Sequence, residues 1–360
     1  EFRPYVVHRF ADGSKDWLFD GFLFLEFKDG SGRNYTVGYE KLNARRTEWE
    51  WLLDRIFEQG KSLSALDRCI GQEIKELGKP AFRHQIVLGL PEAIRGQKDW
   101  GEIDGREMDF SKEEDQIAAT KWYIGELVER FKAAKYKHLE LSGFYWVAED
   151  THHCAELTIP LSEYIHSEGK LFYWIPYWQA KGHEEWKRLG FDVAYQQPNH
   201  FFNHSIPDSR LDEACATARR HGMAMEFEFD EKATAAIPNS SHDRMAAYIN
   251  HFEKNDVFNS SAVAYYCGNR GVLTLDESDN PKDKALMDRL ARIIQARRYL
   301  KYGIPMKNKT RVVAHRGFWH TDGSAQNSIA SLLKADQLGV YGVEFDVWMA
   351  SDGVPVLNHD

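Results

Sequence analysis

Residues 311–360, RVVAHRGFWHTDGSAQNSIASLLKADQLGVYGVEFDVWMASDGVPVLNHD, contain the order of elements that decides the fold of this region. The apolar residues within 327–338 recur at helical spacing, and Gly339 is typical of a helix C-terminus. Strands are predicted over residues 311–314, 343–347 and 354–357. A strand, a helix and a second strand in this order predict a βαβ segment of a parallel sheet.

The polar residues of this stretch follow the predicted strands. His315 comes just after the first strand, and His359 just after the last. Glu344 and Asp346 are two residues apart, so on one strand they would share a face. Two carboxylates on one face repel each other unless a cation lies between them, and Ca²⁺ or Mg²⁺ prefers such oxygen ligands. The guanidinium of Arg316 suits a phosphate oxygen.

The stretch resembles the beginning of the glycerophosphodiester phosphodiesterase family. The resemblance is carried by His315-Arg316-Gly317, Asn327-Ser328, Glu344-x-Asp346, Asp352-Gly353 and His359-Asp360. It implies that His315 and His359 are the general acid and base, that Glu344 and Asp346 bind a divalent metal, and that Arg316 contacts the phosphate. The implied substrate is a small phosphodiester, cleaved to an alcohol and glycerol 3-phosphate.

Two features depart from that family. Gln326 stands where a metal-binding glutamate is usual, and its carbonyl oxygen can still bind Ca²⁺. A phosphodiesterase barrel takes about 250 residues, of which this stretch supplies only the first βαβ segment. We therefore expect a second, truncated TIM barrel after residue 310, and we expect the chain by itself to be inactive.

Upstream, seven strand-like runs alternate with amphipathic helical patterns. The strands are predicted over residues 20–27, 84–90, 137–149, 170–177, 191–196, 222–229 and 261–267. The helices are predicted over residues 49–57, 113–131, 211–221, 242–252 and 282–299. This alternation predicts an α/β fold with a parallel sheet.

The number of elements favours a (β/α)₈ TIM-barrel-like domain over residues 1–302, with its first strand lying before residue 1. The alternative is a doubly wound open sheet, although the sequence lacks a G-x-G-x-x-G motif. A segment over 303–310, with Gly303, Pro305 and several lysines nearby, is typical of a linker to the domain at 311–360.

Three glutamates are candidates for chemistry in this first domain. Glu149 would end the fourth barrel strand, and Glu226 and Glu228 lie on the seventh. Many glycoside hydrolases with this fold place their two carboxylates on those strands, which is an analogy of fold alone. Their carboxyl groups are about 5–5.5 Å apart in retaining enzymes and about 6.5–9.5 Å apart in inverting ones.

Aromatic residues are predicted at the same rim, where rings stack on sugars. They are Tyr145, Trp146, Trp174, Tyr177, Trp178, Phe201 and Phe202. The polar loop Asn199-His200-x-x-Asn203-His204 would line the same mouth, whereas His152-His153-Cys154 is interpreted as a loop without a metal. The alternatives are that the glutamates and rings have structural roles, or that the domain binds a glycan without catalysis.

Residues 1–300 also resemble an uncharacterised family of bacterial barrel domains without an assigned activity. The resemblance is carried by DGFLFLEFKDG, ARRTEWEWLLDR, GQKDWGE, WIPYW, YQQPNHFF, IPDSRLDEAC and GMAMEFE. It implies one continuous domain and indicates little about the substrate.

The composition argues against several classes of binding partner and site. The 360 residues include 43% hydrophobic residues, enough for a packed core, and a net charge of −9 argues against nucleic acid. No apolar run reaches transmembrane length, and the four cysteines lack the spacing of a zinc site or a disulfide framework. No signal peptide is visible; a periplasmic or extracellular location is a guess.

Overall fold

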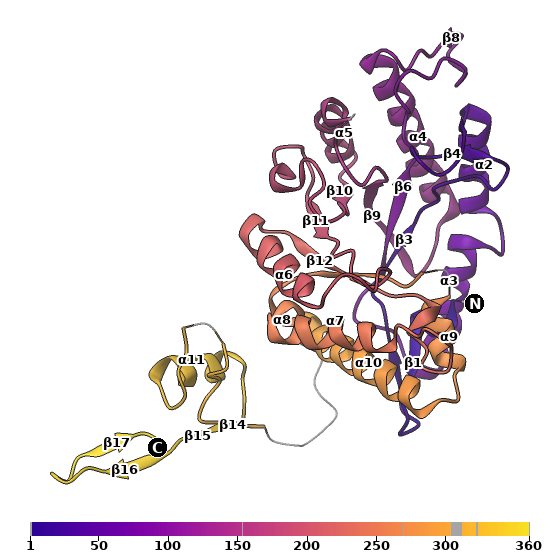
Figure 1. The fold of residues 1–360 in the computed structure, drawn as a ribbon. Coiled ribbons are helices and arrows are strands. Elements are labelled where there is room, and N and C mark those ends of the chain that lie inside the picture. Colours follow the sequence, from indigo (N-terminus) through magenta and orange to yellow (C-terminus); the bar gives the residue numbers. More distant parts are fainter. Residues whose placement is uncertain (1, 153, 269, 304–311, 322, 360) are drawn as a thin grey trace. The chain divides into compact units, whose positions relative to one another are not determined.

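The computed structural model describes residues 2–152, 154–268, 270–303, 312–321 and 323–359. The chain divides into two compact units, residues 1–302 and 303–360 (Figure 1). Most of the predicted linker over 303–310 lies outside the described residues, as does His153.

The first unit is built on a curled parallel sheet of seven strands, and each predicted strand has a counterpart in it. The strands are β3 (Gly21–Phe24), β6 (His84–Leu90), β9 (Leu139–Trp146), β10 (Leu171–Trp174), β11 (Val193–Gln196), β12 (Ala224–Glu228) and β13 (Val263–Tyr266). Their order in the sheet follows their order in the chain. All carboxyl ends therefore lie at one edge, where such sheets collect functional groups.

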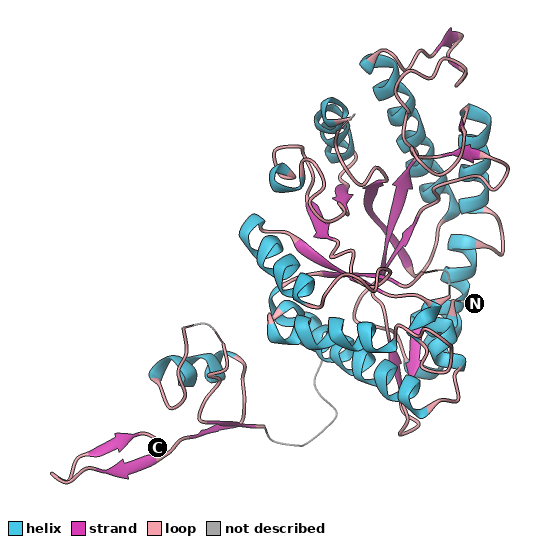
Figure 2. Ribbon diagram, in the orientation of Figure 1, coloured by secondary structure: helices cyan, strands magenta, loops and turns pink. Residues whose placement is uncertain are grey.

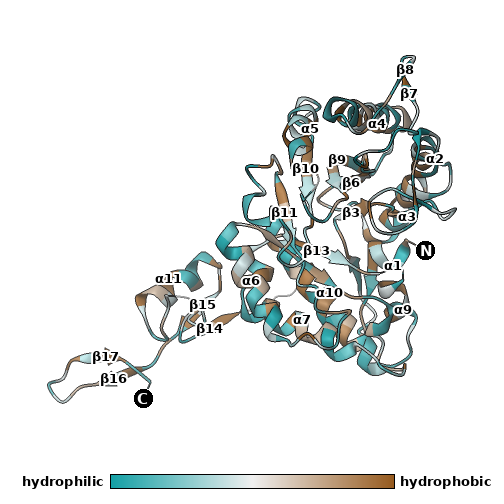
Figure 3. Ribbon diagram, turned by 45° about the horizontal axis from the view of Figure 1, so that its top comes forward, coloured by the Kyte–Doolittle hydropathy of each residue, from teal (hydrophilic) through white to brown (hydrophobic). Residues whose placement is uncertain are grey.

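Helices lie outside the sheet and bury their apolar sides against it (Figure 1). They are α1 (Arg3–Val6), α2 (Arg46–Phe57), α3 (Ser62–Leu77), α4 (Glu113–Ala134), α5 (Ala155–Ser167), α6 (Ser209–His221), α7 (His242–Lys254), α8 (Val257–Ser260), α9 (Gly271–Glu277) and α10 (Pro281–Tyr302). Hydrophobic and hydrophilic residues are mixed along α6, α7 and α10, as expected for half-buried helices (Figure 3). The sequence patterns missed the longer helices α3 and α5 and the short helices α1, α8 and α9. No helix in the described part of the chain is long and apolar enough to span a membrane.

The two faces of the sheet pack differently. Ile86 and Leu88 belong to the main core, whereas Tyr145, Val147 and Ile175 form a smaller cluster on the other face. Gly143 on β9 is needed for close packing, because a Cβ atom there would lie 2.0 Å from the carbonyl oxygen of Leu171.

The sheet is a partial barrel. β3 and β13 are its terminal strands, and no ladder joins them among the described residues. Helix α10 holds the region next to β3, because the Arg298 guanidinium donates hydrogen bonds to the carbonyl oxygens of Trp17 and Leu18. The eighth strand placed before residue 1 remains a prediction.

Three short pairs of strands lie outside the sheet of the first unit. They are β1 (Val7–Arg9) with β2 (Lys15–Trp17), β4 (Arg33–Asn34) with β5 (Leu42–Asn43), and β7 (Glu102–Ile103) with β8 (Arg106–Glu107); only the first pair precedes the sheet.

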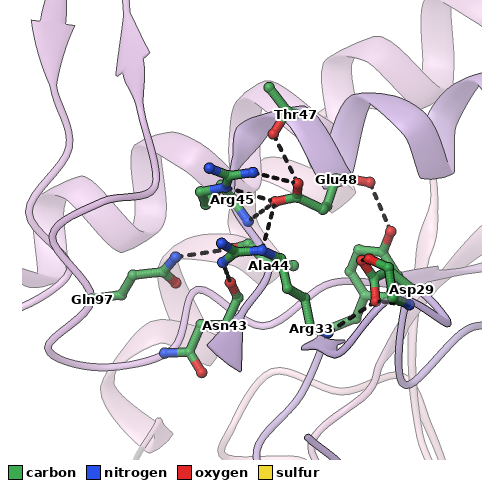
Figure 4. A network of polar contacts seen from close by, with 10 residues as sticks. Asp29, Arg33, Asn43, Ala44, Arg45, Thr47, Glu48 and Gln97 are labelled. Carbon is green, nitrogen blue, oxygen red and sulfur yellow. Dashed lines mark hydrogen bonds and ion pairs between the residues drawn. The ribbon is translucent and has the colours of Figure 1, made fainter. Parts of the chain in front are cut away.

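A polar network anchors the segment between β3 and α2 (Figure 4). Glu48 accepts hydrogen bonds from the backbone and guanidinium of Arg45, at 2.8 and 2.9 Å. Arg33 donates to the carbonyl oxygen of Asn43 at 2.6 Å, and Gln97 donates to that of Ala44 at 3.0 Å. The hydrogen bonds from Arg45 lower the pKa of Glu48 to about 2. These contacts fix the part of the segment that leads into α2.

The second unit combines a parallel pair of strands with a hairpin (Figure 2). Its elements are β14 (Val313–His315), α11 (Ile329–Gln337), β15 (Gly342–Glu344), β16 (Val347–Met349) and β17 (Pro355–Leu357). The parallel β14–β15 pair matches the predicted strand, helix and strand. The strand predicted over 343–347 is wrong in extent, because the chain leaves β15 at Glu344 and then forms an antiparallel hairpin with β17.

Candidate functional site

Two of the predicted glutamates are buried on one strand of the first unit. Glu226 and Glu228 are 6% and 2% exposed. They are two residues apart on β12, so both face the same side of the sheet. Their partners in register on β13 are Ala264 and Tyr266. Such a pair of carboxyl groups is costly to bury unless one of them stays protonated.

Glu228 is held by donors from two neighbouring elements. The backbone N–H of His200 donates to its carboxylate at 3.2 Å, and the Tyr248 hydroxyl of α7 also donates to it. Burial raises the pKa of Glu228 to about 7, although these hydrogen bonds act in the opposite direction. Glu228 can therefore change its protonation state near neutral pH.

Glu149 lies just beyond β9 and is held by an amide relay. Gln197 donates from Nε2 to the Glu149 carboxylate at 3.0 Å, and Asn199 donates from Nδ2 to Gln197 Oε1 at 2.8 Å. Asn199 has a φ of 48° and accepts a hydrogen bond from the backbone of Trp178 at 2.5 Å. This relay fixes which end of the Gln197 amide faces Glu149. Burial raises the pKa of Glu149.

Glu226 is the most strongly perturbed of the three. Burial is the main cause that raises its pKa well above the ordinary value, and the charges of Glu228 and Glu149 raise it further. The three carboxyl groups therefore act on one another, and Glu226 keeps its proton to higher pH than an ordinary glutamate. A protonated carboxyl beside an ionisable one can carry out general acid–base chemistry.

The predicted aromatic rim is only partly correct. Tyr177 and Phe202 are exposed, Trp178 is half-buried, and Tyr145, Trp146, Trp174 and Phe201 are buried. Trp146 and Trp174 pack in the main core because they face the helices. Two exposed rings near the carboxylates, Tyr39 and Tyr266, were missed. Tyr266 could have been found, since it ends a predicted strand beside Glu228.

The polar loop after β11 contributes mainly through Asn199 and the His200 backbone. The His200 ring is buried and contacts Asp208 at 2.8 Å, while His204 contacts Ser241 at 2.9 Å. Asn203 accepts hydrogen bonds from Ser205. These side chains stabilise the loop. Cys154 is buried.

A cavity of about 390 Å³ lies at the same edge of the sheet, near the terminal strands. Its lining includes Leu25 and Glu26 after β3, Val147 after β9 and Gly268 after β13. Glu26 is half-buried, and burial raises its pKa while Arg55 lowers it. The cavity falls within the size range of small-molecule sites.

In the second unit, the three residues that were predicted to bind a metal through oxygen atoms all contact Arg316. Its backbone N–H donates to Glu344 at 3.1 Å, its guanidinium donates to Gln326 at 2.9 Å, and its Nε lies 3.3 Å from Asp346. His315 Nε2 lies 3.8 Å from Glu344. Although β15 ends at Glu344, Glu344 and Asp346 therefore both contact Arg316.

Asn327 fixes Asp346 within this group. Its side chain donates to the Asp346 carboxylate at 3.1 Å and accepts from the Asp346 backbone at 3.2 Å. Asn327 has a φ of 56° and precedes Ser328, which caps α11. His359 follows β17 and is exposed.

Two carboxylates and an amide oxygen are the ligand types that a hard cation prefers. Here the Arg316 guanidinium contacts Gln326 and Asp346, and the Arg316 backbone N–H contacts Glu344. Over the described ranges, however, no group of three or more His, Cys, Asp and Glu side chains is arranged to hold a metal ion.

The second unit also leaves much apolar surface uncovered. Ile329 and Leu333 of α11 are 74% and 57% exposed, and Trp348 and Met349 of β16 are 59% and 68% exposed. A surface of this kind needs a covering element or partner.

Comparison with known proteins gives two separate family matches. Residues 1–292 match the family described as a domain of unknown function, DUF4855, and residues 315–360 match the glycerophosphoryl diester phosphodiesterase family. Glycerophosphodiester phosphodiesterase 1 of Rattus norvegicus is 39% identical over 67 residues, which is 19% of this chain and 19% of that protein. The human protein of the same name is 39% identical over 54 residues, covering 15% and 16%. The chain thus spans less than a fifth of these curated relatives.

Solved structures share only a general likeness. A Bacteroides thetaiotaomicron protein, provisionally assigned as an alpha-L-fucosidase, has a TM-score of 0.39 and 12% identity, covering 77% of this chain and 93% of its own. The carboxyl transferase domain of Rhizobium etli pyruvate carboxylase has a TM-score of 0.34 and 11% identity, covering 72% and 41%. Likenesses this weak carry no argument about function.

Proposed function

We propose that this chain, which belongs over residues 1–292 to the DUF4855 family and also matches the glycerophosphoryl diester phosphodiesterase family over residues 315–360, combines a phosphodiesterase-type unit with a first unit whose buried carboxyl groups suit hydrolysis. The second unit would supply the first residues of a phosphodiesterase site. The convergence of Glu344, Asp346 and Gln326 on Arg316, with His315 beside them, is the observation that supports this most.

In this proposal the substrate is a glycerophosphodiester. One of His315 and His359 removes a proton from a water molecule, whose oxygen forms the new bond to phosphorus, and the other protonates the oxygen of the leaving alcohol as its bond to phosphorus breaks. The products are the free alcohol and glycerol 3-phosphate. Glu344, Asp346 and Gln326 would hold Ca²⁺ or Mg²⁺, which would polarise the phosphodiester when bound. Arg316 would then be released from its carboxylate partner to contact the phosphate.

The test is release of glycerol 3-phosphate from glycerophosphocholine by a protein that carries residues 1–360 and the remainder of a phosphodiesterase domain. We expect metal-dependent turnover, and His315→Ala should lower kcat by about 10²–10⁴-fold, the usual contribution of a general acid or base. His320→Ala, in the same segment but outside the group, is the control and should change little. Residues 1–360 alone should release none. Turnover that survives both His315→Ala and chelation would contradict the proposal.

A second function is supported by the buried carboxyl groups of the first unit. Glu149, Glu226 and Glu228 interact in one cluster, which suits acid–base hydrolysis of a glycosidic bond. We expect reducing sugar to be released from a neutral polysaccharide, and Glu149→Gln or Glu226→Gln to lower the rate at least about 100-fold. Glu140→Gln is the matched control, because Glu140 lies on β9 but is exposed. If Glu149→Gln and Glu226→Gln both retained full activity, the cluster would not be catalytic. If the unmodified chain cleaves no polysaccharide, the proposed hydrolysis is wrong.

A further inference from the structure

We infer that Tyr39 and Tyr266 form a carbohydrate-binding platform beside the carboxylate cluster, and that its ligand is an oligosaccharide without acidic groups. This inference deepens the second function proposed above and rests on it for the position of the site. It concerns binding, so it can be tested separately from hydrolysis.

Exposed rings in the first unit are concentrated near the carboxylates. Among its described Tyr, Trp and Phe residues, those that are exposed are Tyr39, Trp51, Tyr177, Phe202 and Tyr266. Tyr177 donates to Asp150, the neighbour of Glu149, at 3.0 Å, and Phe202 packs edge-to-face against Tyr266 with 5.8 Å between ring centroids. Trp51 lies instead on α2, where Arg55 covers its ring. Exposed aromatic side chains that gather at one site indicate binding.

Tyr39 is held in position rather than left on a free loop. Its ring is 46% exposed and stacks on Phe27, with centroids 4.7 Å apart and planes 6° from parallel. Its backbone N–H donates to Asn34 at 3.1 Å, and Asn34 donates to the carbonyl oxygen of Glu40 at 2.7 Å. The network around Glu48 fixes the rest of this segment (Figure 4). A ring ordered before binding loses little entropy when a ligand stacks on it.

Tyr266 comes from the opposite terminal strand of the sheet. It ends β13 in register with Glu228, and its side chain is 43% exposed. Burial raises the pKa of Tyr266, and Glu226 is the largest charged contributor. Burial also raises the pKa of Tyr39 to about 12, with smaller contributions from Glu149 and Tyr266.

Phe27, on which Tyr39 stacks, packs against the small cluster around Tyr145. That cluster lies on the face of the sheet opposite the main core, and Glu226 and Glu228 face the same way because Phe227 between them belongs to the main core. Both tyrosines therefore lie on the face that carries the carboxylates.

This combination of groups selects the chemistry of the ligand. Aromatic faces pack against the C–H face of a sugar ring, while carboxylate and amide groups bind its hydroxyls. Glu228 is the register partner of Tyr266, and Asp150 accepts a hydrogen bond from Tyr177, so ionised carboxylates beside the rings would repel uronic acids or sulfated sugars. A neutral oligosaccharide can stack on the rings and is not repelled by the carboxylates.

Binding is measured by calorimetry with cellohexaose, xylohexaose, mannohexaose and chitohexaose, and with oligogalacturonate as the acidic probe. The protein is the full chain carrying Glu226→Gln, which prevents turnover. We expect at least one neutral probe to bind. Tyr39→Ala and Tyr266→Ala should each weaken that binding about tenfold, Tyr39→Phe should retain it, and Trp51→Ala, the exposed-ring control, should leave it within about twofold.

The outcomes separate this inference from the proposed hydrolysis. Binding that depends on Tyr39 and Tyr266, without any turnover by the unmodified chain, would support the platform and remove the glycosidase. Turnover that is unaffected by Tyr39→Ala and Tyr266→Ala would support the glycosidase and remove the platform. The inference is overturned if none of the four neutral probes binds, if both alanine variants bind normally, or if oligogalacturonate binds more tightly than the neutral probes.

Discussion

Glu226→Gln is expected to stabilise the first unit increasingly as pH rises from 4 to 8, with a gain in the range of about 0.5–2 kcal/mol that is usual for a single stabilising substitution. The reason is that burial and two neighbouring carboxylates raise the pKa of Glu226 in the folded protein. Below the ordinary pKa of glutamate, the side chain is protonated in both the folded and the unfolded state, so it does not lower the free energy of unfolding. As pH rises, the unfolded state releases its proton first, and the folded state loses stability relative to it. Glutamine avoids that cost because it has no proton to release.

The measurement is thermal unfolding of the unmodified chain and the variant between pH 4 and pH 8. The two proteins should unfold at the same temperature near pH 4, and the variant should gain progressively up to pH 8. Glu228→Gln should gain less, because Glu228 accepts hydrogen bonds from His200 and Tyr248 that suit a carboxylate. Exposed Glu140→Gln should be neutral. A constant difference at every pH would show that titration of Glu226 is not the cause.

His84 is expected to make the first unit sensitive to acid. Its ring is fully buried and surrounded by Trp17, Phe22 and Phe82. Neither ring nitrogen has a hydrogen-bond partner within the described residues. Burial lowers its pKa from the ordinary value of 6.5 to about 4. As pH falls through this range the unfolded state binds a proton that the folded state excludes, which costs about 3 kcal/mol by pH 4.

His84→Phe should remove that cost, because the neighbouring rings can accommodate another apolar ring. At pH 7.5 the variant should differ from the unmodified chain by less than about 1.5 kcal/mol, as for other substitutions that conserve shape. Urea unfolding at pH 7.5, 5.5 and 4.5 should show a smaller loss of stability for the variant. Equal losses in the two proteins would place the acid sensitivity elsewhere.

The sequence was sufficient for features that depend on local spacing. Alternating and helical patterns predicted all seven strands of the sheet and five of its covering helices, because each pattern reflects burial of one face. Helix α3 was missed although Leu63, Leu66 and Ile70 form a buried stripe. The motif around His315 was recognisable because its residues occur at fixed spacing, and the family match at 315–360 agrees with it.

Predictions from local sequence patterns were wrong where two different structures fit the same residues. Residues 343–347 alternate as a strand should, yet the chain bends after Glu344 and forms a hairpin. Trp146 and Trp174 are aromatic residues at strand ends, which fits a rim as well as a core. Their side chains face the helices and belong to the core. A rim residue and a core residue differ only in the side of the sheet to which the side chain points.

By itself, the sequence determined the order of strands and helices, the division of motifs between the two parts of the chain, and the residues of the phosphodiesterase-like segment. Only the tertiary structure decided that Glu149, Glu226 and Glu228 act on one another, that Gln197 holds one of them, and that Tyr39 stands beside them. The physical reason is that periodicity records which face of an element is buried. The curl and register of the sheet decide which distant residues meet at its edge.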